Sequence, residues 1–462
     1  MNSMQLLPYK QQVSSLLRLG LPIVVGQLGM IILGLADTIM IGHHSTEELA
    51  AAAFVNNVFN LAIIFATGFS YGLTPLIGML QGGGNTQGIG RVFRNALAAN
   101  ASVAVLLTAV MYTVYCFVDK LGQPEELLPH IRPYFVLQLI SLLFIMLFNG
   151  FRQFAEGLTD TRTPMWILLG GNALNIFGNY LLIYGSFGFP EWGLFGAGVS
   201  TLVSRIVMLL VFIGVVAVAR RYKVYREAIL RSRFNRNDFM QLNALGWPIA
   251  LQMGMETAAF SLSAIMVGWL GSIPLAAHQI MISVSTIGFM VYYGMGAALA
   301  VRVSHFMGQK DFPNLRRAVN SGMGIILSLA IVASLFFYLA RTPIIYSFTE
   351  DHEVMIVVSS LIFSLIVYQF GDALQITFAN ALRGTTDVKP MMWIAFFSYF
   401  IVALPVGYLC GFTWGGGVVG VWVAFPAGLF TAGFLFWLRF RYRLQQLMNC
   451  LLYTSDAADD KA

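Results

Sequence analysis

The chain has 462 residues, of which 58% are apolar or aromatic and 10% are charged, against roughly 25% charged residues in an ordinary soluble domain. At about 20 apolar residues for each membrane crossing, this composition leaves room for roughly a dozen transmembrane helices and excludes a water-soluble globular protein. The net charge of +6 comes from 27 Lys and Arg against 21 Asp and Glu. In a polytopic membrane protein the placement of these charges indicates orientation, and we expect no nucleic-acid partner.

Long apolar windows follow one another along the whole chain, and a basic stretch at 220–236 divides them into two sets of six. The first set predicts transmembrane helices near 19–41, 49–79, 92–118, 130–151, 164–186 and 194–219. The second set predicts helices near 244–270, 275–303, 317–340, 354–381, 391–411 and 416–438. We therefore predict an all-α polytopic membrane protein of twelve transmembrane helices in two six-helix bundles.

An internal repeat relates these two sets at an offset of 226 residues. Leu19–Ile23 (LGLPI) matches Leu245–Ile249 (LGWPI), and the register continues through loops and spans. Because each repeat has six spans, both enter the membrane from the same side, and a pseudo-twofold axis along the membrane normal relates the halves. The predicted domains are an N-terminus at 1–18, a lobe at 19–219, a basic linker at 220–243, a lobe at 244–438 and a tail at 439–462.

The distribution of basic residues predicts the orientation in the membrane. If the N-terminus is cytoplasmic, the outer loops hold only Lys120, Arg132 and Arg341, and the inner segments hold the rest. By the positive-inside rule, both termini are cytoplasmic in a bacterial inner membrane. The stretch at 449–462 resembles translated sequencing-adapter read-through, and the alternative is a genuine acidic tail.

Four ionisable residues lie deep inside predicted spans, where proximity to a loop cannot explain them: Asp37, Arg205, Glu256 and Asp372. A central Asp, Lys or Arg costs about 2.5 to 3.5 kcal/mol to insert, so such residues usually face a partner or a water-filled path. Burial disfavours the charged form of a carboxylate, and a bound proton, sodium ion or organic cation offsets that cost. The alternative is that these charges only hold helices together, with Arg205 as an internal counter-charge.

Uncharged polar residues accompany these charges. Asn175 and Asn179 are one turn apart on the fifth span, Thr201 lies in the sixth, and Tyr368 precedes Asp372 by one turn. They predict an oxygen-rich pocket around Asp37 and a second site around Asp372, although interhelical hydrogen bonding also explains the two asparagines. His43 and His44, in the first outer loop without a third ligand nearby, are expected to be a solvated pair.

With these features in place, the chain resembles the multidrug and toxic compound extrusion (MATE) family, in its NorM-like branch, over residues 15–440. The resemblance rests on Leu35–Gly42 (LADTIMIG), Leu174–Asn175, Asn179–Tyr180, Glu256, Tyr368–Asp372 (YQFGD) and Ala381–Gly384 (ALRG). It implies two six-helix lobes around a central cavity. It also implies export of cationic or amphipathic drugs in exchange for Na⁺ or H⁺.

The resemblance assigns roles to the polar residues. Glu256, Asp372 and Tyr368 match the cation-coupling positions, with Glu256 and Asp372 as the expected Na⁺ ligands. The N-lobe proton or substrate site comprises Asp37, Asn175, Asn179 and Thr201. Arg205 has no counterpart in the pattern, and its role stays open. Carboxylates in both lobes favour the NorM-like branch, whose members mostly use Na⁺.

We expect no cofactor beyond the coupling ion, small organic cations as partners, no obligate protein partner and a monomer. A flippase for lipid-linked saccharides is one alternative, but its pyrophosphate cargo requires several cavity Arg or Lys, whereas only Arg205 qualifies. A membrane-embedded enzyme is the other. It requires a nucleophile and a base at matching depth, and Ser70 has no evident partner, so we expect no enzymatic activity.

Overall fold

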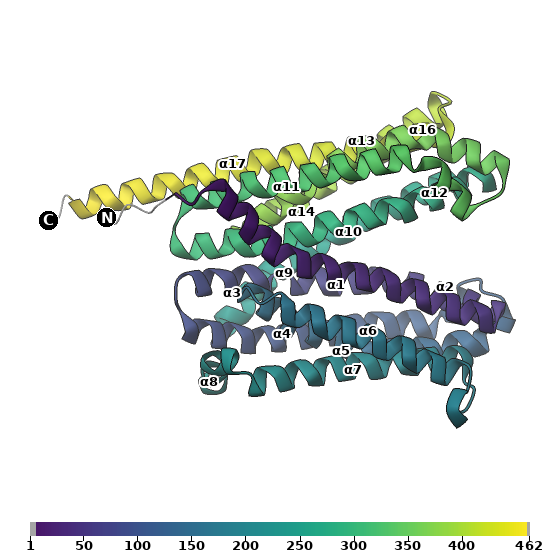
Figure 1. Ribbon diagram of the computed structural model, residues 1–462, viewed down its shortest axis with the longest axis horizontal. Helices are drawn as coiled ribbons and strands as arrows, with labels where there is room; N and C mark the ends of the chain where they lie inside the picture. Colours follow the sequence, from purple (N-terminus) through teal and green to yellow (C-terminus); the bar gives the residue numbers. More distant parts are fainter. Residues whose placement is uncertain (1–5, 460–462) are drawn as a thin grey trace. The chain divides into compact units, whose positions relative to one another are not determined.

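A computed structural model describes the backbone of residues 6–459 and the side chains of residues 6–449. Every regular element in this range is helical, and twelve segments are long and apolar enough to cross a membrane (Figure 1). The predicted fold class is therefore confirmed. The first six spans are α1 (Tyr9–His44), α2 with α3 (Thr46–Ser70, Leu73–Gly82), α4 (Thr86–Cys116), α5 (Leu128–Gly157), α6 (Arg162–Ile183) and α7 (Gly193–Val218).

The second set of spans follows two connecting elements, η4 (Arg220–Tyr222) and α8 (Lys223–Arg231). It consists of α9 (Arg236–Gly268), α10 (Ser272–Gln309), α11 (Phe312–Leu339), α13 (His352–Gly384), the segment Lys389–Thr413, and α16 with α17 (Gly417–Trp422, Ala424–Asp459). The connecting helix α12 (Arg341–Phe348) precedes α13, and the short helices η1 (Val118–Lys120), η2 (Glu125–Leu127) and η3 (Ser186–Gly188) lie in loops. Apolar windows alone predicted none of these connecting elements.

The eleventh span is irregular. It consists of α14 (Lys389–Phe396), the π-helical turns η5 (Phe397–Ala403), α15 (Leu404–Tyr408) and the π-helical turns η6 (Leu409–Thr413). Pro405 lacks the N–H that would bond to the carbonyl of Ile401, so the regular α-helical ladder is interrupted there. Wider π turns often occur at functional sites, and η5 carries the buried Tyr399.

By their internal contacts, the helices form two units. Val25–Ala250 form the N-terminal unit, and the described chain up to Val24 and from Leu251 forms the C-terminal unit. The two boundaries lie within α1 and α9 and are 226 residues apart, which is the repeat spacing. Each also follows a helix-internal proline, Pro22 or Pro248. The start of α1 thus belongs with the second repeat and the start of α9 with the first, a division that span counting did not predict.

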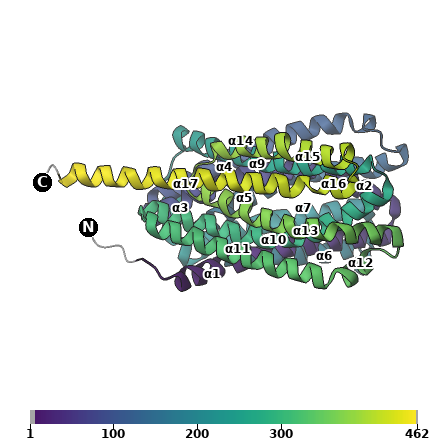
Figure 2. The same ribbon diagram turned by 90° about the horizontal axis from the view of Figure 1, so that it is seen from above.

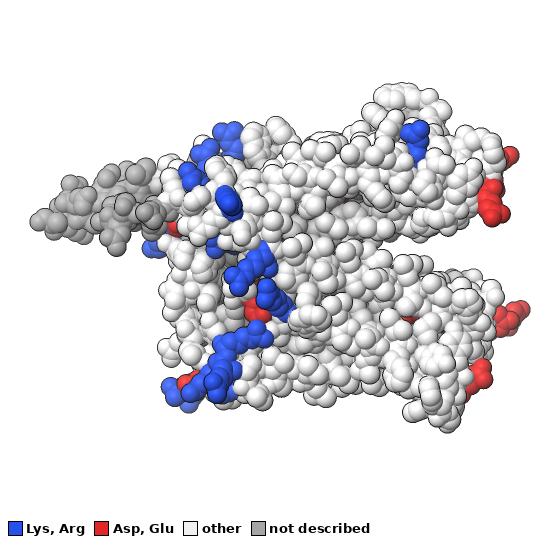
Figure 3. All heavy atoms as spheres, viewed as in Figure 1, with Lys and Arg blue, Asp and Glu red and all other residues white. Residues whose placement is uncertain are grey.

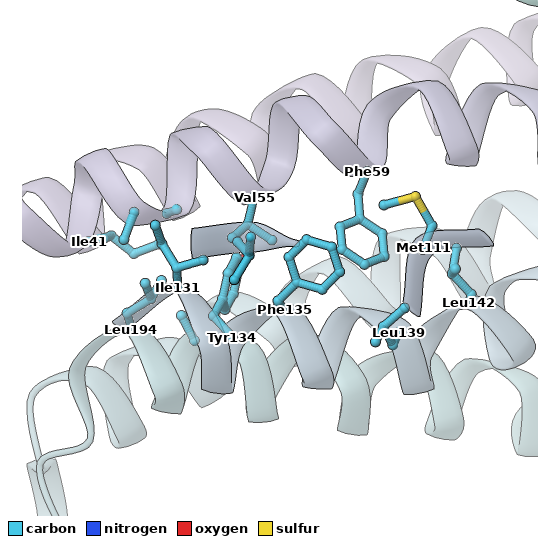
Figure 4. Packing of buried hydrophobic residues seen from close by; sticks show 14 of the residues in the cluster. Ile41, Val55, Phe59, Met111, Ile131, Tyr134, Phe135, Leu139, Leu142 and Leu194 are labelled. Carbon is cyan, nitrogen blue, oxygen red and sulfur yellow. The ribbon is translucent and has the colours of Figure 1, made fainter. Parts of the chain in front are cut away.

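In the N-terminal unit, an apolar cluster joins the end of α1 with α2, α4, α5 and α7 (Figure 4). Phe59 and Phe135 form its centre, with ring centroids 4.7 Å apart in an edge-on arrangement. Both rings are almost fully buried, and aromatic pairs of this geometry contribute about 0.5 to 1.5 kcal/mol beyond their buried area. This cluster fixes α5 between its neighbours.

In the C-terminal unit, α13 is an interior helix. It packs against α10, α11 and α17, and in the most apolar stretch of α13 half of the residues are buried, against 28% in α11. Figures 1 and 2 show α17 running alongside α13 and continuing beyond it. Because α13 is enclosed on several sides, its polar residues lie inside the unit.

Charged residues concentrate at the ends of the helices. On the face shown in Figure 3, Lys and Arg of each unit gather mainly at one end of the helix bundle, and the exposed Asp and Glu lie mainly at the other. The sides of each unit between these ends are almost free of charge on that face. A hydrocarbon layer accommodates such an uncharged band.

Candidate functional site

The N-terminal unit brings Asp37 of α1 together with the two asparagines of α6. Asn179 Nδ2 donates to Asp37 Oδ1 at 2.6 Å. Asn175, in the amide orientation that gives both its atoms partners, donates to the same oxygen at 3.0 Å and accepts from Thr201 Oγ1 at 3.1 Å. Both asparagines are buried, and a spacing of four residues places them on one helix face. The four residues predicted for this pocket are therefore adjacent.

Arg205, one turn after Thr201 on α7, points to neutral partners. Its Nη1 donates to Gln138 Oε1 at 3.1 Å and to Ser141 Oγ, both on α5. Tyr134 and Asp37 lie within electrostatic range of it, but no ion pair within 4.0 Å involves Arg205 among the described residues. The guanidinium is thus held by hydrogen bonds and acts on Asp37 through its electrostatic field.

In the C-terminal unit, Asp372 lies in the interior of α13. Its side chain is 0% exposed, and neither carboxylate oxygen has a hydrogen-bond partner among the described residues. Tyr368, one turn earlier, is buried and lies within electrostatic range of both Asp372 and Glu256. A buried carboxylate without donors is costly in its charged form unless a cation or a proton accompanies it.

Glu256 of α9 is held differently, by amides. Gln252 and Gln375 each donate to its Oε2, at 3.0 and 3.1 Å. Gln252 in turn accepts from Arg383 Nη2 at 2.8 Å through its own carbonyl oxygen. Glu256 and Asp372 are also within electrostatic range of each other. The three predicted residues of this site therefore lie within electrostatic range of one another, and amide groups hold Glu256.

Several of these partners escaped sequence reasoning. Gln252, Gln375 and Arg383 around Glu256, and Gln138 and Ser141 around Arg205, were not identified as site residues. Gln252 lies four residues before Glu256, so a search for amides one turn from a buried carboxylate finds it. Gln138 and Ser141 lie far from Arg205 in sequence, and no spacing rule connects them.

The expectation that His43 and His44 form a solvated pair is wrong for His44. Its Nδ1 lies 2.8 Å from Glu48 Oε2 and its Nε2 lies 3.0 Å from Glu191 Oε1. Glu48 also accepts from the backbone N–H of Leu194 at 2.8 Å. The loop between α6 and α7 approaches the α1–α2 turn in the folded unit, and spacing along the sequence does not reveal this proximity.

Twelve helices long and apolar enough to cross a membrane, with carboxylates inside each of two repeat-related units, define a polytopic membrane protein with carboxylates in its interior. A family model described as MatE matches residues 22–181 and 248–409. The multidrug resistance protein NorM of Photobacterium profundum is 30% identical over 448 residues, which cover 94% of this chain and 96% of that protein. The chain belongs to the MatE family, and the resemblance to its NorM-like branch is confirmed.

Solved structures agree on the fold. A variant of the Vibrio cholerae MATE transporter VcmN superposes with a TM-score of 0.85 at 18% identity, over 95% of this chain and 98% of that one. A MOP superfamily transporter from Pyrococcus furiosus gives 0.82 at 20% identity, over 95% and 97%. That transporter is described as having a binding pocket of reverse polarity, which suggests a different function for it. The shared fold therefore does not identify the substrate, which depends on the residues of the site.

Proposed function

We propose that this protein exports cationic or amphipathic organic compounds in exchange for Na⁺ or H⁺, by alternating access. The observation that carries the proposal is Asp372, which is fully buried, lies within electrostatic range of Glu256 and has neither oxygen hydrogen-bonded among the described residues. Two interior carboxylates within electrostatic range of each other disfavour a doubly charged empty state. The site is therefore suited to hold a small cation.

The coupling ion would bind among oxygen atoms. The carboxylates of Asp372 and Glu256 and the hydroxyl of Tyr368 are hard oxygen ligands of the kind that hard cations prefer. Gln252 and Gln375 hold Glu256 in place by donating to one of its oxygens. Sodium and protons compete for the same carboxylates, and we favour Na⁺ because carboxylates in both units are the pattern of the NorM-like branch, whose members mostly use Na⁺.

The pocket around Asp37 would bind a proton or the organic cation. Asn175 and Asn179 both donate to Asp37 Oδ1 in the satisfied amide orientation, which stabilises the charged carboxylate that an organic cation needs. Asn179 Oδ1 has no hydrogen-bond partner among the described residues, so a donor on the cargo can use it. Exchange follows if one cation leaves as the other arrives.

We infer the substrate class from the relative NorM and not from the geometry of the site. NorM is named a multidrug resistance protein, and the 22 Met and 37 Phe of this chain are residue types that suit an adaptable apolar surface. We place the protein in a bacterial inner membrane with both termini cytoplasmic, working as a monomer without enzymatic activity. As repeats along the sequence, we keep lobes at 19–219 and 244–438 joined by the linker 220–243, whereas packing groups the chain into the units bounded at Val24 and Ala250.

The flippase alternative gains no support from Arg205. A pyrophosphate-bearing cargo needs several positive groups facing it, and Arg205 donates to Gln138 and Ser141 within its own unit. Asp37 within its electrostatic range further offsets its charge. A pocket built around the carboxylate of Asp37, with a single arginine held by neutral partners, favours cationic cargo.

The test is ethidium efflux from pump-deficient bacterial cells that express the full chain, with and without an inward Na⁺ gradient. We expect Na⁺ to accelerate efflux, and Glu256→Gln and Asp372→Asn to abolish it while insertion persists. Glu227→Gln, the same chemical change at an exposed position of α8, is the matched control. Normal export by Glu256→Gln would overturn the coupling role, and absent efflux by the inserted wild type would favour the flippase.

A further inference from the structure

The segment after α7 is built into the N-terminal unit. Tyr222 donates to Asp160 Oδ2 at 2.6 Å, and Arg221 forms an ion pair with the same carboxylate at 3.0 Å. Burial raises the pKa of the Tyr222 hydroxyl well above its ordinary value, so this hydroxyl stays protonated and remains a donor. Tyr225 donates to Gln81 Oε1 at 2.9 Å. The linker therefore has a defined position against the end of α3 and the loop between α5 and α6.

α8 and the residues after it also cross the start of α4. A Cβ atom on Gly90 would lie 2.4 Å from the carbonyl carbon of Ala228, so the two helices approach as closely as glycine allows. Arg94 Nη1 donates to the carbonyl of Ser232 at 2.5 Å, and Asn95 Oδ1 accepts from the N–H of Asn235 at 2.9 Å. This packing leaves a fixed hollow between the two helices.

That hollow is a cavity of about 390 Å³, within the range of about 300 to 1,000 Å³ that small-molecule sites occupy. Three arginines line it: Arg91 from α4, Arg231 from the end of α8 and Arg233 from the loop that follows. Its polar lining residues are Asn85, Gln87, Arg91, Arg231, Ser232 and Arg233. On the visible face, Lys and Arg gather at this end of the unit, where Figure 1 places α8 (Figure 3).

The three arginines differ in their pairing. Arg91 is bound to Asp238, with Nε 2.6 Å from Oδ2. Arg231 and Arg233 are exposed and form no ion pair among the described residues. The N–H of Gly88 already donates to Asn85 Oδ1 at 2.8 Å, so this N–H at the start of α4 is not available to bind a ligand. Attraction for an anion therefore comes from the two unpaired guanidinium groups.

We propose that this cavity, the arginine pocket, binds the phosphate group of an anionic phospholipid. Guanidinium groups bind phosphate through paired N–H donors, and the exposed side-chain amide of Gln87 adds a neutral donor. A lipid source fits because the adjoining Leu230 and Phe234 are 74% and 60% exposed, and basic segments with exposed apolar residues lie at anionic membrane surfaces. A soluble phosphate ester shares the headgroup chemistry.

The test uses the purified, delipidated full-length protein in neutral detergent. Short-chain phosphatidylglycerol, short-chain phosphatidylcholine and glycerol 3-phosphate are titrated separately, and binding is followed by native mass spectrometry and by thermal stabilisation. The pocket variant is Arg231→Gln with Arg233→Gln. The matched control is Arg220→Gln with Lys223→Gln, which removes the same charge from exposed residues of the same linker outside the pocket. Gln87→Glu is a second pocket variant that leaves both arginines in place.

We expect phosphatidylglycerol to bind, and the pocket double variant to weaken its binding by about 30-fold. Gln87→Glu also weakens it, and the control retains it. Equal protection by glycerol 3-phosphate, lost in the same variants, would support the phosphate site with a soluble source. Equal binding of phosphatidylcholine, or equal loss in the pocket variant and the control, would overturn the proposal.

Discussion

At the scale of single residues, the stability of a charged carboxylate depends on how many hydrogen bonds it accepts. Glu256 accepts two amide hydrogen bonds, whereas Asp372 has none among the described residues. A carboxylate that accepts hydrogen bonds is stabilised in its charged form, and one without donors depends on a bound cation or proton. We infer that Asp372 responds more strongly than Glu256 to whether the site is occupied.

A substitution of Gln252 tests whether its hydrogen bond orients the carboxylate of Glu256. Replacing it by Leu removes a donor to Glu256 and an acceptor from Arg383. A hydrogen bond to a charged group contributes about 1.5 to 3 kcal/mol, so we expect the Na⁺ concentration for half-maximal efflux to rise at least about tenfold. Gln445→Leu, at an exposed position of α17, is the control. An unchanged Na⁺ requirement would show that Gln252 does not position the carboxylate.

Glu48 provides a prediction on stability. In Glu48→Ala, the buried N–H of Leu194 loses its acceptor and His44 loses one of its two glutamate partners. A buried donor without a partner costs about 1 to 3 kcal/mol, so we expect a lower unfolding temperature in detergent. The neighbouring Glu47 is exposed, and Glu47→Ala should have little effect. Equal shifts in the two variants would contradict the role of Glu48.

At the scale of elements, close helix contacts depend on small residues. The second span is interrupted at Tyr71 and Gly72, where it meets α9. A Cβ atom on Gly72 would lie 2.9 Å from the backbone nitrogen of Gly246, and a backbone atom cannot move aside as a flexible side chain can. Glycine at position 72 therefore allows the first part of α9 to pack within the N-terminal unit.

Gly72→Val tests this contact. We expect it to separate α9 from the end of α2 and to cost about 1 to 3 kcal/mol, as overpacking typically does. The measurement is the thermal unfolding midpoint of the purified protein. Gly214→Val on α7 is the control, because a Cβ atom there meets nothing within 4 Å. If both variants unfold at the same temperature, the contact is not tight in solution.

At the scale of the whole molecule, the orientation in the membrane can be tested with cysteines. The native Cys116 is exposed at the end of α4, on the outer face in the proposed orientation. In a variant in which Cys410 and Cys450 are alanine, a membrane-impermeant maleimide should label Cys116 in intact cells. Lys223→Cys on a background in which Cys116 is alanine as well should be labelled only after lysis. The opposite pattern would reverse the topology.

The number of spans, their repeat and the ionisable residues within them were readable from the chain alone. Each depends on local quantities, namely the apolar length needed to cross a membrane and the insertion cost of one charge. The same reasoning identified Asp37, Glu256 and Asp372, whose functional roles stay predictions. Locating the residues required no knowledge of which helix faces meet.

Only the folded structure showed what surrounds these residues. Gln138 and Ser141 bind Arg205 across helices, His44 joins Glu48 to Glu191, and the linker forms a cavity with α4. The division of α1 at Val24 also depends on packing. The physical reason is that apolar periodicity specifies which residues avoid water, whereas contacts between distant helices depend on shape and hydrogen-bond geometry that no local pattern encodes.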